Sequence, residues 1–310
     1  MTALIDIFLK FDFWGCLLLG YPLNIILIIL IIFKTPKEME THSRILIQNC
    51  VLDILILTVQ MLAQNFYITD KDGNAIFIIT DGILVYIMKE NFKPLLLYIL
   101  YLVYQFTFYL STDGLCIQFI YRYLILNKNM KIGIRRYLHM FSIVALINLI
   151  YVLYTNLSGM PYSGGGIKQV VDGNFNKTLP LFTCEMNDVG LATVFMSIFI
   201  ESIPFPIIFF CAITMVKYVN AHTGLDAKMK RLFRQLTKTL IILAVVPFIK
   251  QAAMLILIYY DYTGNSLPNI YRIIIGIWCH FTPVFNAIIC ILTNKPYRKA
   301  VFKSLRIYPQ

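Results

Sequence analysis

The sequence CIQFIYRYLILN, residues Cys116–Asn127, ends an apolar block that begins at Pro94. Arg122 stands near the end of that block with a tyrosine on each side and no acidic residue beside it. The chain is 59% hydrophobic and only 14% charged, with a mean hydropathy of +0.72. Soluble domains carry about 25% charged residues. The composition therefore indicates a membrane protein, with Arg122 at the edge of the hydrocarbon.

Seven stretches of the chain are long and apolar enough to cross a bilayer. The hydrocarbon core is about 30 Å thick, which a helix of about 20 residues spans. An eighth apolar stretch, residues 75–88, is too short to span, and we expect a loop helix or a hairpin there. The sequence predicts an all-α membrane protein, in which residues 1–310 form a single domain with a seven-transmembrane helix bundle. The predicted spans are residues 13–33, 45–67, 94–124, 138–158, 190–216, 239–260 and 273–294.

The distribution of basic residues gives the orientation of the bundle. With the N-terminus outside, 19 of the 27 Lys and Arg fall on the cytosolic side, as the positive-inside rule requires. An eighth span would place these basic loops on the wrong face. The net charge of +11 is therefore a belt facing anionic lipid and a cytosolic partner, not a nucleic-acid surface. Residues 295–310 carry five of these basic residues around an apolar face, which predicts a short interfacial C-terminal helix.

Charged residues inside the predicted spans are informative because each is costly there unless it is paired or hydrated. Asp53 is the only formal charge in the second span, and Asn24 of the first span is a natural partner for it. One interpretation is a structural polar contact between helices, and the other is an ion or water site that changes with conformation. Glu201 and Lys250 lie in the fifth and sixth spans. They could pair, but the sequence does not place them at one height.

Prolines interrupt two of the predicted spans. Pro247 lies within the sixth span and Pro283 within the seventh. Each removes a backbone hydrogen bond and bends its helix. Such a bend is either a static kink or a hinge, and both interpretations stay open at this stage.

Several motifs together resemble a known receptor family. Seven spans, an outside N-terminus, Asn24, Asp53 and an Arg-Tyr pair closing the third span resemble rhodopsin-type G-protein-coupled receptors. The segments LNIILIILIIFKTPKEM, NCVLDIL, FIYRYLIL, RQLTKTLIILAVVPF and NKPYRKAVF resemble nematode chemosensory serpentine receptors of the superfamily that contains the str, srd and srh classes, with the delta class preferred. The resemblance covers almost the whole chain.

This resemblance implies a chemosensory receptor that converts binding of a small extracellular ligand, such as an odorant or a pheromone, into activation of a heterotrimeric G protein. The expected location is the plasma membrane, in the sensory cilium of chemosensory neurons. A mostly apolar pocket, covered by the loops 68–92 and 159–189, favours a neutral or weakly polar ligand. The implied G-protein contacts are Arg122, Tyr123, Arg231, Arg234 and Arg298. The implied activation switch is Asn24, Asp53, Pro247 and Pro283. The implied pocket residues are Tyr101, Tyr104, Glu201, Lys250 and Trp278.

The sequence departs from the wider receptor group in three places. Tyr121 stands where an acidic residue usually precedes the arginine. Cys184 has no evident partner for the usual extracellular disulfide, and the motif TPVFN lacks the tyrosine that commonly follows. The alternative role for Arg122 is that of an interfacial anchor, with its stem in hydrocarbon and its guanidinium reaching water or backbone carbonyls.

Other classes of function find little support in the sequence. There is no CxxC or HExxH spacing, and the four histidines are scattered, so we expect no metal, no cofactor and no enzymatic activity. A ligand-gated ion channel or a membrane carrier is the alternative function. The absence of repeated, matched broken helices speaks against a carrier. The sequon NKT at Asn176 predicts glycosylation of an outer loop.

Overall fold

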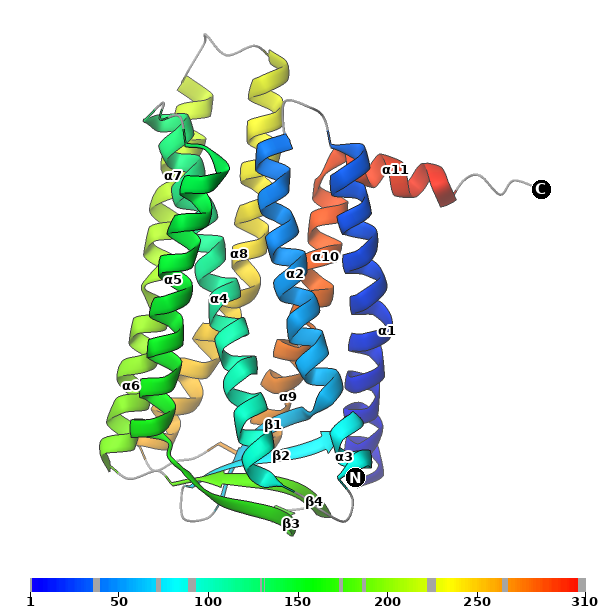
Figure 1. The fold of residues 1–310 in the computed structure, drawn as a ribbon, viewed down its shortest axis with the longest axis vertical. Coiled ribbons are helices and arrows are strands. Elements are labelled where there is room, and N and C mark those ends of the chain that lie inside the picture. The colour runs from blue at the N-terminus through cyan, green and yellow to red at the C-terminus, as the bar shows by residue number, and fades with distance from the viewer. Residues whose placement is uncertain are drawn as a thin grey trace, which may run out of the picture.

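The computed structural model describes residues 2–35, 40–70, 74–88, 93–128, 130, 132–172, 175–185, 188–221, 227–263 and 267–305. Six of the described helices or helix runs are long and apolar enough to span a membrane, and a bent pair adds a seventh span. The prediction of a seven-helix bundle is confirmed (Figure 1). The first four spans are built from α1 (Thr2–Lys34), α2 (Glu40–Leu62), α4 (Pro94–Asn127) and α5 (Ile134–Tyr154). The last three are α6 (Asp188–Ser202) with α7 (Pro204–Ala221), α8 (Ala227–Tyr262), and α9 (Asn269–His280) with α10 (Thr282–Thr293).

Two spans are broken near prolines. The fifth is divided into α6 and α7 at Ile203, directly before Pro204. The seventh is bent by 44° between α9 and α10, and Pro283 lies in the first turn of α10. Because the proline ring cannot donate to the preceding turn, the break falls where the sequence removes the hydrogen bond. Pro247, in contrast, lies inside the unbroken 36-residue helix α8.

A four-stranded antiparallel sheet covers the extracellular end of the bundle, and the sequence analysis did not predict it. Its strands are β1 (Gln64–Thr69), β2 (Ala75–Asp81), β3 (Tyr162–Asp172) and β4 (Phe175–Cys184), in the order β1-β2-β4-β3. The predicted second span, 45–67, is corrected here: the helix ends at Leu62, and β1 follows with alternating burial. The expected hairpin or loop helix at 75–88 is present as β2 and the short helix α3 (Ile83–Ile87).

One glycine is required where the sheet meets the bundle. Gly82 follows β2 with φ of 135°, in the left-handed region that other residues rarely adopt. A Cβ atom there would also lie 2.5 Å from the carbonyl oxygen of Leu62. Gly82 therefore lets the chain leave β2 against the end of α2.

All seven cysteines, including Cys184 on β4, are free thiols. Cys184 is fully buried beneath the sheet, and this burial raises the pKa of its thiol to about 12. The thiol is therefore protonated at neutral pH and unreactive. The outer loop that carries Cys184 is held in place by strand pairing instead of a disulfide, since β4 pairs with both β2 and β3.

The helix α11 (Lys295–Leu305) leaves the opposite end of the bundle and runs sideways (Figure 1). It follows α10 after a single residue, Asn294, whose side chain donates to the Cys290 carbonyl. The hydroxyl of Tyr297 lies 2.9 Å from that of Thr35 at the end of α1. This direction is the one expected of a helix lying along the membrane surface. A continuous core of apolar side chains from α1, α2, α4, α7, α8 and α10 fills the cytosolic half of the bundle.

Candidate functional site

A cavity of about 190 Å³ lies in the extracellular half of the bundle. Its walls come from α4, α6, α8 and α9, and side chains of the sheet form its ceiling. Phe66 and Tyr67 of β1 and Phe77 of β2 line it at this ceiling. Phe77 stacks on Phe182 at 4.7 Å between ring centroids and lies 4.2 Å from the ring of Tyr101. The sheet therefore closes the cavity from outside with aromatic rings.

The structure brings four of the five predicted pocket residues together. Tyr101, Tyr104, Glu201 and Lys250 all line this cavity. Trp278 does not line it, and this prediction is corrected. The Trp278 side chain is 37% exposed, and its ring packs on Phe285 at 5.3 Å.

The two predicted charges face the same cavity but do not form an ion pair within 4 Å. The ammonium of Lys250 lies 3.7 Å from the ring centroid of Phe108 and 5.8 Å from that of Tyr109. The carboxylate of Glu201 accepts a hydrogen bond from the Tyr151 hydroxyl at 3.1 Å. The two helices thus bring both charges to one cavity without a direct ion pair.

Three further polar residues at this site were missed by the sequence analysis. His280 lines the cavity, and its Nδ1 lies 2.6 Å from a carboxylate oxygen of Asp12. The Gln64 amide donates to the same oxygen at 2.6 Å. All three are almost fully buried, and they join α1, β1 and α9. Asp12 was passed over because the first span was predicted to start at residue 13, whereas α1 begins at Thr2.

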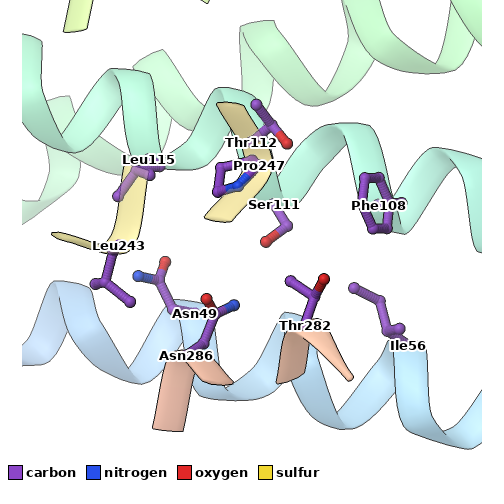
Figure 2. Close-up of a pocket in the computed structure, with 10 residues that line it drawn as sticks. All are labelled: Asn49, Ile56, Phe108, Ser111, Thr112, Leu115, Leu243, Pro247, Thr282 and Asn286. Carbon is purple, nitrogen blue, oxygen red and sulfur yellow. The ribbon is translucent and has the colours of Figure 1, made fainter. Parts of the chain in front are cut away.

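A second cavity, of about 20 Å³, lies deeper between α2, α4, α8 and α10 (Figure 2). Asn49, Ser111, Pro247 and Asn286 are among the side chains that line it. This volume has room for one water molecule. Beside it, the Asn286 amide donates to the carboxylate of Asp53 at 3.0 Å.

Asn24 does not bond to Asp53, so the predicted pairing is corrected. Its amide donates to the carbonyl oxygens of Gly20, at 2.9 Å, and Pro283, at 3.2 Å. The second bond ties the first span to a carbonyl at the bend between α9 and α10. The Asn24 side chain of α1 therefore contacts the backbone of the seventh span and not the carboxylate of Asp53 in the second span.

Arg122 is buried near the cytosolic end of α4, with 2% of its surface exposed. None of its three guanidinium nitrogens has a hydrogen-bond partner among the described residues. The expectation that it reaches water or backbone carbonyls at the interface is therefore not met. The neighbouring Tyr121, which replaces the usual acid, donates to the Ile132 carbonyl at 3.3 Å and packs on the ring of Tyr137. Tyr121 therefore offers no counter-ion to Arg122, and its hydrogen bond attaches the end of α4 to the second cytosolic loop.

The other predicted cytosolic residues are dispersed around this end of the bundle. The ring of Tyr123 lies 5.9 Å from that of Phe210 on α7. Arg234 donates to Asn220 at 2.6 Å, which links α8 to α7. Arg298 is exposed on α11, and its guanidinium lies 3.4 Å from the Leu292 carbonyl. The side chains of Arg231 and Asn176 lie outside the described parts; the backbone of Asn176 pairs with Val171 in the β3–β4 hairpin.

Two hydrogen bonds that the sequence analysis did not foresee join α8 to α10 on the cytosolic side. The hydroxyls of Thr239 and Thr293 lie 2.9 Å apart. The Gln235 amide donates to the Thr293 carbonyl at 3.0 Å. Thr239 is almost fully buried, so its hydroxyl has no access to water. These bonds hold the cytosolic half of α8 against the seventh span.

The described structure thus combines a seven-helix bundle with a cavity beneath an outer sheet, a buried acid in the second span and an arginine at the inner end of the third. The fold is similar to that in the crystal structure of squid rhodopsin, with a TM-score of 0.70 and 14% sequence identity over 98% of this chain and 86% of that chain. The model of the family "Serpentine type 7TM GPCR chemoreceptor Srd" matches residues 10–303. The chain belongs to this family and is a chemosensory G-protein-coupled receptor of the membrane. Comparison with the curated proteins found no match. The match to the family model confirms the resemblance inferred from the sequence motifs.

Proposed function

We propose that this receptor binds a small extracellular molecule, an odorant or a pheromone, in the 190 Å³ cavity and activates a heterotrimeric G protein through the cytosolic end around Arg122. Its place of action is the plasma membrane, in the sensory cilium of chemosensory neurons. An antibody against an N-terminal tag should stain intact cells, because the first span leaves the N-terminus outside.

The observation that carries this proposal is the buried guanidinium of Arg122 without a hydrogen-bond partner in the described structure. Burying a cation without compensation costs several kcal/mol. An outward movement of α8 would open this region and let Arg122 donate to carbonyl oxygens of a helix of the G protein. The resting conformation is thus poised for a partner that supplies acceptors.

The path from the cavity to Arg122 runs along α8. Lys250 faces the cavity, and Pro247, one turn away, lines the small inner cavity. Thr239 lies about two further turns along the same helix, at its bond to the seventh span. A ligand that contacts Lys250 acts on a helix whose proline weakens its middle and whose cytosolic half is held by few bonds. The neighbouring part of this switch consists of Asn24, Asp53 and Pro283. Asn24 donates to the Pro283 carbonyl at the bend of the seventh span, and the Asp53 carboxylate accepts from Asn286 of the same span.

The test is agonist-independent nucleotide exchange on G protein in membranes from cells that express matched surface levels of receptor. Arg122→Ala should abolish the basal exchange of the wild type. The matched control is Arg135→Ala, because Arg135 is an exposed basic residue in the first turn of α5. Each variant is also measured together with Thr239→Val, which we expect to raise basal exchange. Unchanged exchange in Arg122→Ala would refute the role of Arg122, and ionic current in the same cells would favour a channel.

A further inference from the structure

His280 lines the proposed ligand cavity and is held by the buried carboxylate of Asp12 behind the wall. Its Nδ1 lies 2.6 Å from Asp12 Oδ2, and the exposed fractions of the two side chains are 3% and 0%. The centroid of the imidazole ring lies 4.8 Å from that of Phe66 and 6.3 Å from that of Tyr104, both in T-shaped arrangements. The ring of His280 is therefore held in one orientation by a hydrogen bond and two aromatic neighbours.

The groups around Asp12 indicate that His280 donates to it through Nδ1. The Gln64 amide donates to Asp12 Oδ2 at 2.6 Å, and the Cys16 thiol donates to Oδ1 at 3.4 Å. The orientation of the Gln64 amide is fixed in turn, because its oxygen accepts from the Thr80 hydroxyl at 2.8 Å. A carboxyl group that accepts from an amide and a thiol is suited to the ionised form, which only accepts. Nδ1 of His280 therefore carries the proton in this contact.

The other ring nitrogen of His280, Nε2, is left for the cavity. It forms no hydrogen bond with the residues that the structure describes. The two nitrogens of an imidazole point in widely different directions, so Nε2 points away from Asp12. A neutral histidine presents a lone pair at this nitrogen, and a protonated one presents an N–H donor. A hydroxyl group of a ligand satisfies either form, because a hydroxyl can both donate and accept.

The charges of the lining favour a ligand without a formal charge. Glu201 and Lys250 have opposite signs and face the same cavity. The guanidinium carbon of Arg272 lies 5.1 Å from the ring centroid of Tyr67 at the ceiling, and Arg272 has a further partner within the protein. The described lining therefore has no excess charge that would select an anion or a cation.

We propose that the cavity binds a small amphiphilic alcohol, whose hydroxyl bonds to His280 Nε2 and whose apolar part lies among the aromatic rings of the lining. The proposal deepens the function proposed above and rests on that ligand cavity. Asp12 and Gln64 position the imidazole and do not touch the ligand. The cavity, about 190 Å³, is slightly larger than the cavity of about 150 Å³ that holds benzene in an engineered protein. A molecule of about six to nine non-hydrogen atoms is therefore the expected size, on the order of hexanol.

The test compares three probes of nearly equal size: hexanol, hexyl fluoride and hexylamine. Their effect on the melting temperature of the purified full-length receptor is measured as a function of concentration. Hexanol should stabilise the wild type with a half-maximal concentration at least about tenfold below that of hexyl fluoride, because an analogue without the hydroxyl leaves the buried nitrogen unpaired. Transfer from water alone would give the opposite order, since the hydroxyl loses its hydrogen bonds to water. Hexylamine, which is charged at neutral pH, should not stabilise the receptor.

The variants separate the ligand bond of His280 from its bond to Asp12. His280→Asn keeps an amide that can donate to Asp12 and removes the nitrogen left for the cavity, so it should fold and lose the response to hexanol. His280→Gln, whose longer side chain brings an amide closer to the place of Nε2, should keep part of that response. The matched control is His139→Asn, because His139 is an exposed histidine on α5, and it should respond as the wild type does.

Two further measurements keep the test decisive. The comparison of hexanol with hexyl fluoride in the wild type does not depend on whether the variants fold. Basal nucleotide exchange shows that each variant couples to G protein without any ligand.

Four outcomes would overturn the inference. An equal response to hexanol and hexyl fluoride would make the cavity an apolar site without an anchoring bond. Stabilisation by hexylamine alone would make Glu201 the anchor for a cationic ligand. An equal response to hexanol in the wild type and His280→Asn would place the hydroxyl elsewhere. No response to any of the three probes in a receptor with intact basal exchange would refute the alcohol class and leave the proposed coupling to G protein standing.

Discussion

Removing the two bonds between α8 and α10 should shift the receptor toward its active conformation. The perturbation is the pair Thr239→Val and Gln235→Leu, which deletes the Thr239–Thr293 contact and the donation from Gln235 to the Thr293 carbonyl. Valine has nearly the shape of threonine, so packing is kept at a site that is only 1% exposed. The change therefore removes hydrogen bonds that exist only while α8 lies against the seventh span, together with the donation of the Thr239 hydroxyl to the Gln235 carbonyl at 3.1 Å within α8.

The magnitude follows from the number of bonds lost. An interhelical hydrogen bond in a membrane protein contributes about 0.6 kcal/mol on average. A factor of ten in an equilibrium corresponds to about 1.4 kcal/mol. Each single substitution should raise the ratio of active to resting receptor about threefold, and the pair about sevenfold. The pair behaves additively only if both bonds break in one movement of α8.

The assay reads the helix position directly and needs neither ligand nor G protein. Spin labels at Arg136→Cys on α5 and Lys238→Cys on α8 are exposed, whereas the native cysteines are buried or half-buried. Pulsed electron resonance then gives the fraction of molecules with the longer distance between the labels. Thr214→Val is the matched control, because the Thr214 hydroxyl is exposed and bonds only within its own helix, to the Phe210 carbonyl. A long-distance fraction in the double variant no greater than in the wild type would refute the reasoning.

Three further outcomes are expected. Arg122→Leu should raise the melting temperature of the purified receptor, since it removes a buried cation without a hydrogen-bond partner in the described structure; a lower melting temperature would show that the guanidinium is satisfied by solvent. Asp12→Ala should destabilise the receptor by about 3–5 kcal/mol in chemical unfolding, because it leaves His280 and Gln64 buried without their shared acceptor, and a loss below about 1 kcal/mol would contradict a structural role for the pair. Gly82→Ala should increase amide exchange in β1 and β2, because its Cβ would meet the Leu62 carbonyl at 2.5 Å, whereas Gly133→Ala, where nothing lies within 4 Å, should leave exchange unchanged.

The bundle could be predicted from the sequence because hydrocarbon imposes a simple length rule on each apolar block. The same length rule gave no indication of the sheet. The predicted second span was carried through the polar pair Gln64 and Asn65 to Tyr67, whereas the helix ends at Leu62 and residues 64–69 form β1, with alternating burial and pairing to β2. Asp12 was missed for a related reason. A span defined by hydropathy starts after this acidic residue, at residue 13, whereas α1 begins at Thr2 and its residue Asp12 is fully buried.

For the site, the sequence identified which residues are unusual but not how they face one another. Glu201 and Lys250 stood out as charges in spans, and the structure places both in one cavity. Whether they pair depends on the rotation of α6 relative to α8, which hydropathy does not encode. Trp278 was assigned to the pocket by its type, but the bend before α10 leaves its ring against Phe285.

Two cations at opposite ends of the bundle suggest how the receptor is built to be switched. Lys250 lines the ligand cavity without an ion pair within 4 Å, and Arg122, near the cytosolic end, has no hydrogen-bond partner in the described structure. In the proposed mechanism each is contacted by a partner from a different compartment. If ligand and G protein both favour the conformation with α8 moved outward, linkage requires that each increases the affinity of the other by the same factor. The bonds from Thr239 to Thr293 and from Gln235 to the Thr293 carbonyl contribute to this coupling, because they hold α8 against the seventh span. Weakening these bonds should therefore raise the affinity for an agonist and the affinity for G protein together.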